Sequence, residues 1–201
     1  MNEIPVIFSQ SAPTFKDLST HAHPIKFTWS GKKIPHTVKF LFWVDQSHFH
    51  FLVADENSPG LCHPDSQPSQ FQPELWKYDV AEFFLTSSDR SRYLEFNLAP
   101  NGAWWSSVFT QPREPGPNEP TPIPRVFTSS NQGESSWQAS ASIPLAWLEK
   151  HLDFGKKTTL NATFILNSPT QIFLTAADLG DGAPDFHRPQ FFPPIKPISL
   201  A

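Results

Sequence analysis

Proline is the residue that most limits how this chain can fold. The chain has 22 prolines among 201 residues, about twice the usual share of roughly 5%. Proline lacks a backbone N–H and fixes φ, so it ends helices and is excluded from the centre of a sheet. Regular structure must therefore lie in short segments between loops. The stretch Gln111–Arg125 has six prolines and is expected to be a stiff, extended loop rather than a flexible linker.

The segments between these loops alternate with the period of a β-strand. Phenylalanine and tryptophan, with 19 and 7 copies, favour strands over helices. The alternation predicts a hairpin, a three-strand meander and three further strands, at residues 36–55, 80–109, 136–144, 158–167 and 171–178. Pro144–Gly155 begins with proline, ends with glycine and predicts the one helix. We therefore predict a single domain over residues 1–201, an all-β, two-sheet antiparallel β-sandwich of the immunoglobulin-like or jelly-roll type with one short helix.

Charge and composition exclude several classes of function. The net charge is −4 and no basic stripe is present, so nucleic acid is not an expected partner. No run of about 18 apolar residues occurs, and we expect no membrane span. The first residues lack a basic segment followed by an apolar one, so the sequence predicts a cytoplasmic protein. Cys62 is the one cysteine, which excludes an internal disulfide, and nothing in the sequence addresses the oligomeric state.

The meander suggests a polar site on one face of a sheet. In the simplest register, Glu82 lies opposite Glu95, and Asn97 lies opposite Trp104. Because alternate residues of a strand share a face, these four residues and Ser106 would form one patch. Acids placed directly opposite each other are destabilising, and a slip of one residue would dissolve the patch.

Three interpretations of this patch are open. The outer faces of sandwiches are polar, and the acids can simply be surface residues. The patch can also bind a sugar, because aromatic planes stack on the apolar faces of pyranose rings and carboxylates bind hydroxyl groups. The third interpretation is catalysis by Glu82 and Glu95, since glycosidases use two carboxylates about 5–10 Å apart.

Five motifs in order resemble the family 9 carbohydrate-binding modules and their DOMON-like relatives. "W-x-x-D-x-x-E" is present as Trp76, Asp79 and Glu82. The paired strands "VKFLFWVDQSHFHFLVAD" come before it. The segments "YLEFNLAPNGAWW", "SWQASASIPLAWL" and "PDFHRPQFF" follow it and are similar to the family's later strands, turns and closing segment. The resemblance covers roughly residues 25–200.

The resemblance implies a β-sandwich without enzymatic activity that binds a glycan end or a small saccharide. In sugar-binding members, two tryptophans clamp one glycosyl unit and an acid binds it by hydrogen bonds. Trp76 matches the first tryptophan, Phe186 takes the place of the second, and Glu82 matches the acid. A family arginine is replaced by Glu95, which reverses the charge beside Glu82. A domain that kept the sandwich and lost the sugar site, serving in structure or protein interaction, is the alternative.

Metal and haem are the remaining cofactor candidates. Some members of the family carry structural calcium, and the segment "DLGDGAPD" has three aspartates, Asp178, Asp181 and Asp185, that could bind such a hard cation. The same segment is also explained as a plain turn. Haem binding through methionine and histidine is not expected, because Met1 is the one methionine.

Overall fold

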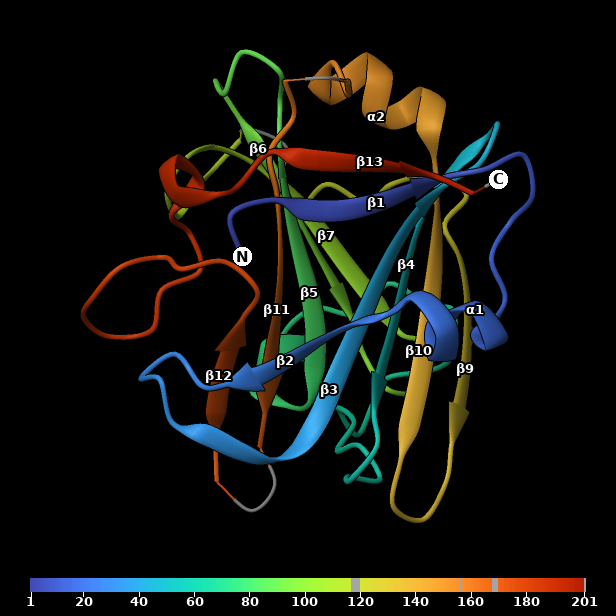
Figure 1. The fold of residues 1–201 in the computed structure, drawn as a ribbon, viewed down its shortest axis with the longest axis vertical. Helices are drawn as coiled ribbons and strands as arrows, with labels where there is room; N and C mark the ends of the chain where they lie inside the picture. Colours follow the sequence, from blue (N-terminus) through green and yellow to red (C-terminus); the bar gives the residue numbers. More distant parts are fainter. Residues whose placement is uncertain (117–119, 156, 168–169, 201) are drawn as a thin grey trace.

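The computed structural model describes residues 1–116, 120–155, 157–167 and 170–200. Within them, thirteen strands form two sheets that pack face to face, with β2 and β3 in front of β5 in Figure 1. Sheet A has the order β13 (Ile195–Ser199), β1 (Ile4–Phe8), β3 (Lys33–Val44), β4 (His48–Asp55), β10 (Trp137–Pro144), β9 (Phe127–Gln132), with β2 (His23–Phe27) paired to β3. Sheet B has the order β12 (Ile172–Thr175), β11 (Leu160–Leu166), β5 (Val80–Thr86), β6 (Tyr93–Leu98), β7 (Trp104–Gln111), β8 (Glu114–Pro115). The predicted β-sandwich is confirmed.

Phenylalanine rings from the inner faces of the two sheets make the main core. Phe42 and Phe51 of sheet A stack with their centroids 5.0 Å apart. Both meet Phe83 of sheet B edge to face, at 5.9 and 5.3 Å. Such edge-to-face contacts add to the burial of apolar area. The alternation seen in the sequence therefore places one face of β5, the face of Phe83, inside the sandwich.

In the described part of the chain, two α-helices flank the sandwich, one more than the sequence analysis predicted. Helix α2 (Leu145–Leu152) is the expected one and closes one end, at the top of Figure 1. Helix α1 (Phe15–His21) was missed. It begins after Thr14, whose backbone N–H donates to the Asp17 carboxylate at 2.7 Å, the reciprocal bond of a capping box.

Strand pairing is antiparallel throughout, apart from strand β1. Strand β1 runs parallel to β13 and to β3, so the first and last strands lie side by side in sheet A. The strands β1, β2 and β9 were not predicted. The proline-rich stretch is a loop that holds only the two-residue strand β8 in its described part, and residues 117–119 lie outside the described residues.

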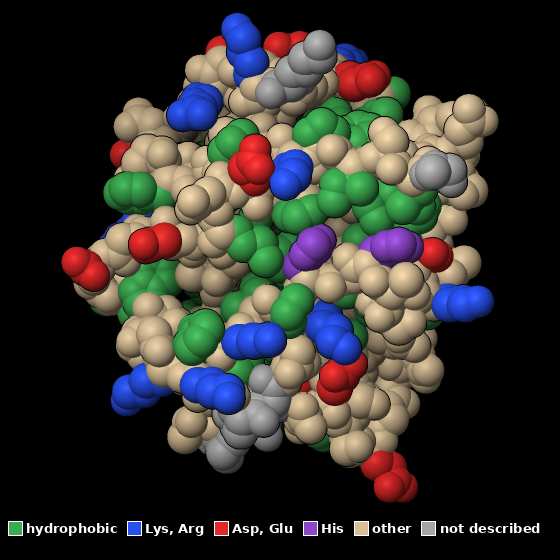
Figure 2. Space-filling view, in the orientation of Figure 1, with side chains coloured by type: hydrophobic (Ala, Val, Ile, Leu, Met, Phe, Trp, Pro, Cys, Tyr) green, Lys and Arg blue, Asp and Glu red, His purple; other side chains and the backbone are tan. Residues whose placement is uncertain are grey.

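The outer faces of both sheets are also partly apolar. Helix α1 covers part of sheet A, where Leu18 packs against Leu41, Trp43 and Leu52. On sheet B, a second apolar cluster is completed by the short 3-10 helix η1 (Leu75–Lys77) and by the segment between β12 and the 3-10 helix η2 (Pro189–Phe191). The face shown in Figure 2 carries Lys and Arg beside Asp and Glu, with apolar side chains between them. The candidate site lies among these segments, on the outer face of sheet B.

Candidate functional site

Strands β5 and β6 bring two acids onto the outer face of sheet B. Glu82 pairs with Asn97, and Phe84 pairs with Glu95. Because alternate residues share a face, Glu82, Glu95 and Asn97 lie on one side, as predicted, although the register is shifted by two residues. Glu82 and Glu95 are therefore diagonal neighbours, a relation in which residues lie about 7–8 Å apart.

The register between β6 and β7 differs by one residue from the expected one. Asn97 pairs with Trp105, not with Trp104. The loop between the strands has three residues, Pro100–Gly102, and Gly102 has a φ of 85°. Such loops need a residue in this left-handed conformation, which glycine adopts without strain. An odd number of loop residues changes the register by one, and that reverses the side chains of β7.

The prediction that Trp104 belongs to the site is therefore wrong. Trp104 lies in the core, stacked on Phe96 with the ring centroids 5.8 Å apart. Ser106 shares its orientation and donates to the Thr121 carbonyl at 2.6 Å. Trp105 takes the outward position beside the acids.

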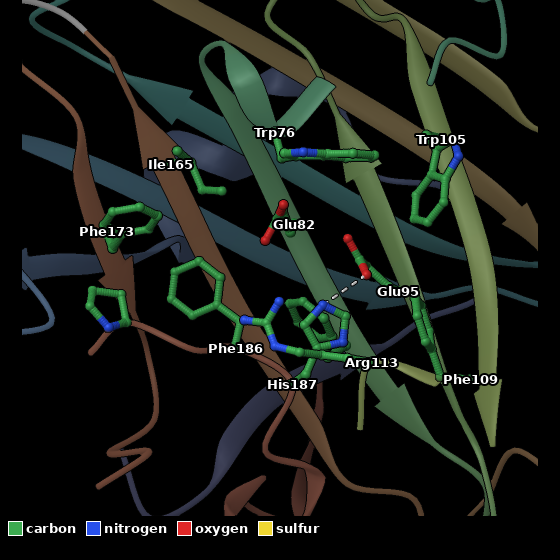
Figure 3. Close-up of a pocket in the computed structure, with 12 residues that line it drawn as sticks. Trp76, Glu82, Glu95, Trp105, Phe109, Arg113, Ile165, Phe173, Phe186 and His187 are labelled. Atoms are coloured by element: carbon green, nitrogen blue, oxygen red, sulfur yellow. Dashed lines mark ion pairs between the residues drawn. The ribbon is translucent and has the colours of Figure 1, made fainter. Parts of the chain in front are cut away.

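A cavity of about 400 Å³ opens over the acids (Figure 3). Its side chains come from η1, from strands β5, β6, β7, β11 and β12, from the turn after β7 and from the segment that follows β12. The lining residues are Trp76, Glu82, Phe84, Glu95, Trp105, Phe109, Arg113, Ile165, Phe173, Pro184, Phe186 and His187. Segments far apart in the sequence thus meet at one hollow, and its volume falls within the range for small-molecule sites, roughly 300–1,000 Å³.

Trp76 forms one wall of this cavity. Helix η1 carries it, after Glu74 in a left-handed conformation with a φ of 66°. Its ring meets Trp105 edge to face at 5.7 Å, which leaves the side chain 37% exposed. Figure 3 shows Trp76 on one side of the carboxylates and Phe186 with His187 on the other. A flat ligand would therefore meet an aromatic ring on both sides.

Glu82 is a buried acid at the floor of the cavity. The residue is 2% exposed, and Thr163 on β11 donates its hydroxyl to Oε2 at 3.0 Å. Burial, followed by the negative charge of Glu95, raises the pKa of Glu82 well above its usual value, and the bond from Thr163 offsets only part of this. Glu82 therefore holds a proton more readily than an exposed glutamate.

Glu95 stands at the end of a chain of hydrogen-bonding groups. Asn97 Nδ2 donates to its Oε1 at 3.1 Å, and His187 Nε2 lies 3.5 Å from Oε2. Tyr93 Oη lies 2.7 Å from His187 Nδ1. Burial raises the pKa of Tyr93. Because Nε2 faces the Glu95 carboxylate, the tautomer that fits these contacts has the Tyr93 hydroxyl donating to Nδ1. His187 then carries its proton on Nε2, directed at Glu95.

His187 is a neutral histidine. Burial, and then the positive charge of Arg113, lowers its pKa to about 4, against a smaller opposite effect of Asp185. Arg113 itself lies at the rim, with a side chain that is 62% exposed and an Nη2 atom 2.9 Å from Asp185 Oδ1. The positive charge at the rim is thus balanced by Asp185, and the acids at the floor have no charged histidine beside them.

The fold brings together four of the six residues that the sequence analysis expected at the ligand site. Trp76, Glu82, Glu95 and Phe186 line the cavity. Asn97 is fully buried beneath them, and its Oδ1 has no hydrogen-bond partner among the described residues. The sequence analysis missed Trp105, Phe109, Arg113, Phe173 and His187. A correct β6–β7 register would have found Trp105 and Phe109, and His187 follows Phe186 in the chain.

The three candidate metal-binding aspartates have separate partners. Asp178 Oδ1 accepts the Gly180 N–H at 2.9 Å, and Asp185 accepts from Arg113. The Asp181 backbone carbonyl accepts from Arg188 Nη1 at 2.8 Å. Among the described residues, no group of three or more His, Cys, Asp or Glu side chains is placed to hold a metal. The absence of a cofactor stays the prediction, with calcium at these aspartates as the untested alternative.

Comparison with known proteins gives two relatives by sequence. No protein-family model matches the chain. A protein named "Extracellular protein" from Arthroderma benhamiae is 30% identical over 144 residues, which span 62% of this chain and 64% of that protein, less than two thirds of its length. The UPF0462 protein C4orf33 homolog of Danio rerio is 24% identical over 171 residues, 84% of this chain and 85% of that protein.

Solved structures show the fold more clearly. A Bacteroides uniformis protein provisionally assigned as carbohydrate-binding has a TM-score of 0.71 at 17% identity, over 98% of both chains. A family 9 carbohydrate-binding module of Caldicellulosiruptor kristjanssonii in complex with cellotriose scores 0.65 at 13% identity, over 99% of this chain and 95% of that one. A family 9 module of the same organism in complex with glucose scores 0.63 at 15% identity, over 98% and 97%. The fold of this chain is therefore that of carbohydrate-binding β-sandwiches. None of the helices in the described ranges is long and apolar enough to cross a membrane.

Proposed function

We propose that this chain is a non-catalytic carbohydrate-binding module that takes a glycan end or a small saccharide into the cavity on sheet B. The observation that carries the proposal is a partly exposed tryptophan, Trp76, beside two buried carboxylates in a hollow of about 400 Å³. The assignment to one DOMON-like domain over residues 1–201 belongs to the same proposal.

The chemistry of the cavity suits a sugar ring. The C–H face of a pyranose would pack on Trp76, where burial contributes about 25 cal/mol per Å² of apolar area. A sugar hydroxyl both donates and accepts hydrogen bonds, and a protonated Glu82 does the same. Glu95 would accept from a second hydroxyl. Aromatic walls with a few polar groups at the floor are typical of small-molecule sites.

The arrangement of the acids favours binding over hydrolysis. In most glycosidases the two carboxyl groups flank the scissile bond. Glu82 and Glu95 instead lie on one face of one sheet, as diagonal neighbours at the floor of the cavity. A sugar resting on Trp76 would have both acids on the same side. The similar solved structures, which include a family 9 carbohydrate-binding module, support the same view.

A glycan array with purified protein tests the proposal, run once with calcium and once with a chelator. We expect binding to a set of saccharides that share one end group. Hydrolysis of a bound saccharide would support the enzyme instead, and no binding to any glycan would support an interaction domain.

Calorimetry on a saccharide from the array then locates the site. Trp76→Ala should remove most of the affinity. Glu82→Gln should cost about 1 kcal/mol, the net contribution of a hydrogen bond between neutral groups. Glu149→Gln removes an exposed acid from helix α2 and should bind as the wild type does. Equal affinity in all variants would place the site elsewhere.

A further inference from the structure

The polarity of the cavity changes from one side of sheet B to the other. The strands below it lie in the order β12, β11, β5, β6, β7. In the same order, the side chains that these strands point into the cavity include those of Phe173, Ile165, Glu82, Glu95 and Trp105. Figure 3 shows Ile165 and Phe173 on one side of Glu82, and Glu95 on the other. A ligand above Glu82 therefore meets a carboxylate on one side and apolar side chains on the other.

Three side chains, those of Ile165, Phe173 and Phe186, form what we call the apolar wall of the cavity. Ile165 and Phe173 are paired neighbours on β11 and β12. Phe173 meets Phe186 edge to face, with the ring centroids 6.0 Å apart. The outer apolar cluster of sheet B includes Ile165 and Phe186, and Phe173 packs against it. Phe173 is only half-buried, so the wall still offers apolar surface to a ligand.

The backbone behind the apolar wall is already hydrogen-bonded. Ile165 lies in β11, which pairs with β5 on one side and with β12 on the other. The Phe173 carbonyl accepts the backbone N–H of Trp29 at 2.7 Å. The Phe186 carbonyl accepts the backbone N–H of Arg188 at 2.8 Å. A hydroxyl group that a ligand directs at this wall would exchange water for apolar side chains, and an unpaired buried hydroxyl weakens binding.

The polar floor and the apolar wall lie close enough for one sugar to touch both. Thr163, which donates to Glu82 at 3.0 Å, lies two residues before Ile165 on β11. Alternate residues of a strand share a face and are roughly 7 Å apart, a span that one hexose covers. With its ring between Trp76 and Phe186, a hexose would place different parts of its edge on the floor and on the wall.

We propose that the cavity selects 6-deoxyhexoses, with the methyl group at C5 of the sugar on the apolar wall and ring hydroxyls toward Glu82. This inference rests on the proposed function and names its substrate class. The exocyclic carbon is the one carbon substituent of a hexopyranose ring. Without its hydroxyl it is a methyl group, which still fills the space beside the ring and buries apolar area.

Pairs of hexoses that differ only at C6 test the inference: D-glucose, D-galactose and D-mannose, each against its 6-deoxy form. Calorimetry measures the dissociation constant of every sugar. In at least one pair we expect the 6-deoxy form to bind at least about tenfold tighter, because a buried methyl group replaces a desolvated hydroxyl. The 2-deoxy form of the same hexose should bind no tighter than its parent, since it brings no methyl group to the wall.

Two variants of Ile165 separate the chemistry of the wall from its shape. Valine and threonine have nearly the same shape, but threonine adds a hydroxyl. Ile165→Thr should bring the ratio of 6-deoxy to parent affinity close to one, because the new hydroxyl can pair with the hydroxyl at C6. Ile165→Val should keep most of the preference, and Glu149→Gln on helix α2 should leave it unchanged. The ratio compares two sugars in one protein, so a general loss of stability cancels.

The outcomes separate this inference from the proposed function. Binding of the parent hexoses with no gain from the 6-deoxy form, or with an equal gain from the 2-deoxy form, would overturn the inference and leave the proposed function standing. The same affinity ratio in Ile165→Thr and Ile165→Val would also overturn it.

The glycan array decides the case in which none of these hexoses binds. Array ligands that end in a 6-deoxyhexose would support the inference, and array ligands that lack one would overturn it alone. Absence of binding by the hexoses and by every glycan on the array would overturn both the inference and the proposed function.

Discussion

Each outer face of the sandwich places a carboxylate beside a histidine, buried on sheet A and partly buried on sheet B, but the two faces use the pair differently. On sheet A, Asp45 Oδ2 lies 2.9 Å from His50 Nε2, and His50 Nδ1 lies 2.9 Å from Ser142 Oγ. On sheet B, Glu95 Oε2 lies 3.5 Å from His187 Nε2, a long and weak contact. The first cluster is closed on itself, and the second opens into a cavity.

The carboxylates differ in how far their hydrogen bonding is satisfied. Burial alone would raise the pKa of Asp45, but hydrogen bonds from the Ser47 backbone, His50 and the His48 backbone lower it to about 2. Among the described residues, Glu82 has one such bond, from Thr163, and its pKa is raised. A carboxylate whose hydrogen-bond acceptors are all used therefore supports the fold. A carboxylate with an unused acceptor at the floor of a cavity is available to a ligand.

By residue type alone, the cluster on sheet A would be taken for the functional site instead of the cavity on sheet B. Ser142, His50 and Asp45 are the types of a catalytic triad, which is recognised by geometry and role. Strand β10 pairs with β4 on one side and β9 on the other, so its backbone N–H groups are used by the sheet. The backbone N–H groups of β10 are therefore not available to stabilise an oxyanion beside Ser142. We interpret this cluster as structural.

The largest expected difference between the two faces concerns their tryptophans. Trp43 on sheet A is 3% exposed, and its indole N–H donates to the Ser11 carbonyl at 2.8 Å. Trp43→Ala should lower the free energy of unfolding by about 3–5 kcal/mol. Trp76→Ala should lower it by about 1 kcal/mol or less, because its ring is partly exposed. Urea denaturation measures both, and an equal loss in the two variants would make Trp76 a core residue.

The next effect is a pH dependence that comes from sheet B. The unfolded chain protonates His187 below its ordinary pKa of 6.5, whereas the folded chain does so only near a pKa of about 4. Stability from His187 is therefore complete above pH 6.5 and is lost as the pH falls toward 4. Glu82 acts oppositely, because its raised pKa makes its contribution complete below its ordinary value of 4.5 and lost as the pH rises toward its folded pKa.

Glu82→Gln separates these two contributions. In this variant the free energy of unfolding should rise by on the order of 3 kcal/mol between pH 4 and 6.5, which is the contribution of His187. The rise should be steeper than in the wild type, where Glu82 opposes it. The double variant with His187→Gln should lose the added slope. Urea denaturation over a series of pH values measures both. An unchanged slope in Glu82→Gln would show that Glu82 is ionised in the folded protein.

The smallest expected difference compares the two carboxylates directly. Asp45→Asn should lower the free energy of unfolding by about 1–3 kcal/mol, because it weakens several charge-assisted hydrogen bonds. Glu82→Gln should leave stability at neutral pH unchanged or raise it, since it removes a repulsive acid from a buried position. Thermal denaturation of both variants measures the two losses of stability. A greater loss in Glu82→Gln than in Asp45→Asn would show that Glu82 is a structural residue.

Local pattern in the sequence was enough for the strands that alternate clearly. The meander of β5, β6 and β7 and helix α2 follow from alternation, turn residues and Pro144. Helix α1 was missed, although Thr14 and Asp17 have the spacing of a capping box. Strand β1 was missed because its parallel partners, β3 and β13, are distant in the sequence. Such pairing leaves no local pattern.

The candidate site was predicted as far as strand register allowed. Trp76, Glu82 and Phe186 followed from the resemblance, and Glu95 from the face it shares with Glu82. Trp104 was chosen instead of Trp105 because loop length decides register, and a loop of three residues is not distinguished from one of four by composition. The contact of His187 with Glu95 depends on a segment that returns from the end of the chain.

The indole N–H resonances of Trp76, Trp105 and Trp43 test the central claim most directly. A saccharide from the array is titrated into isotope-labelled protein, and the shift of each assigned indole signal is followed by NMR. The account predicts that Trp76 and Trp105 shift with one common dissociation constant, while Trp43 on sheet A stays in place. A shift of Trp43 with Trp76 and Trp105 unmoved would contradict the assignment of the cavity on sheet B as the binding site.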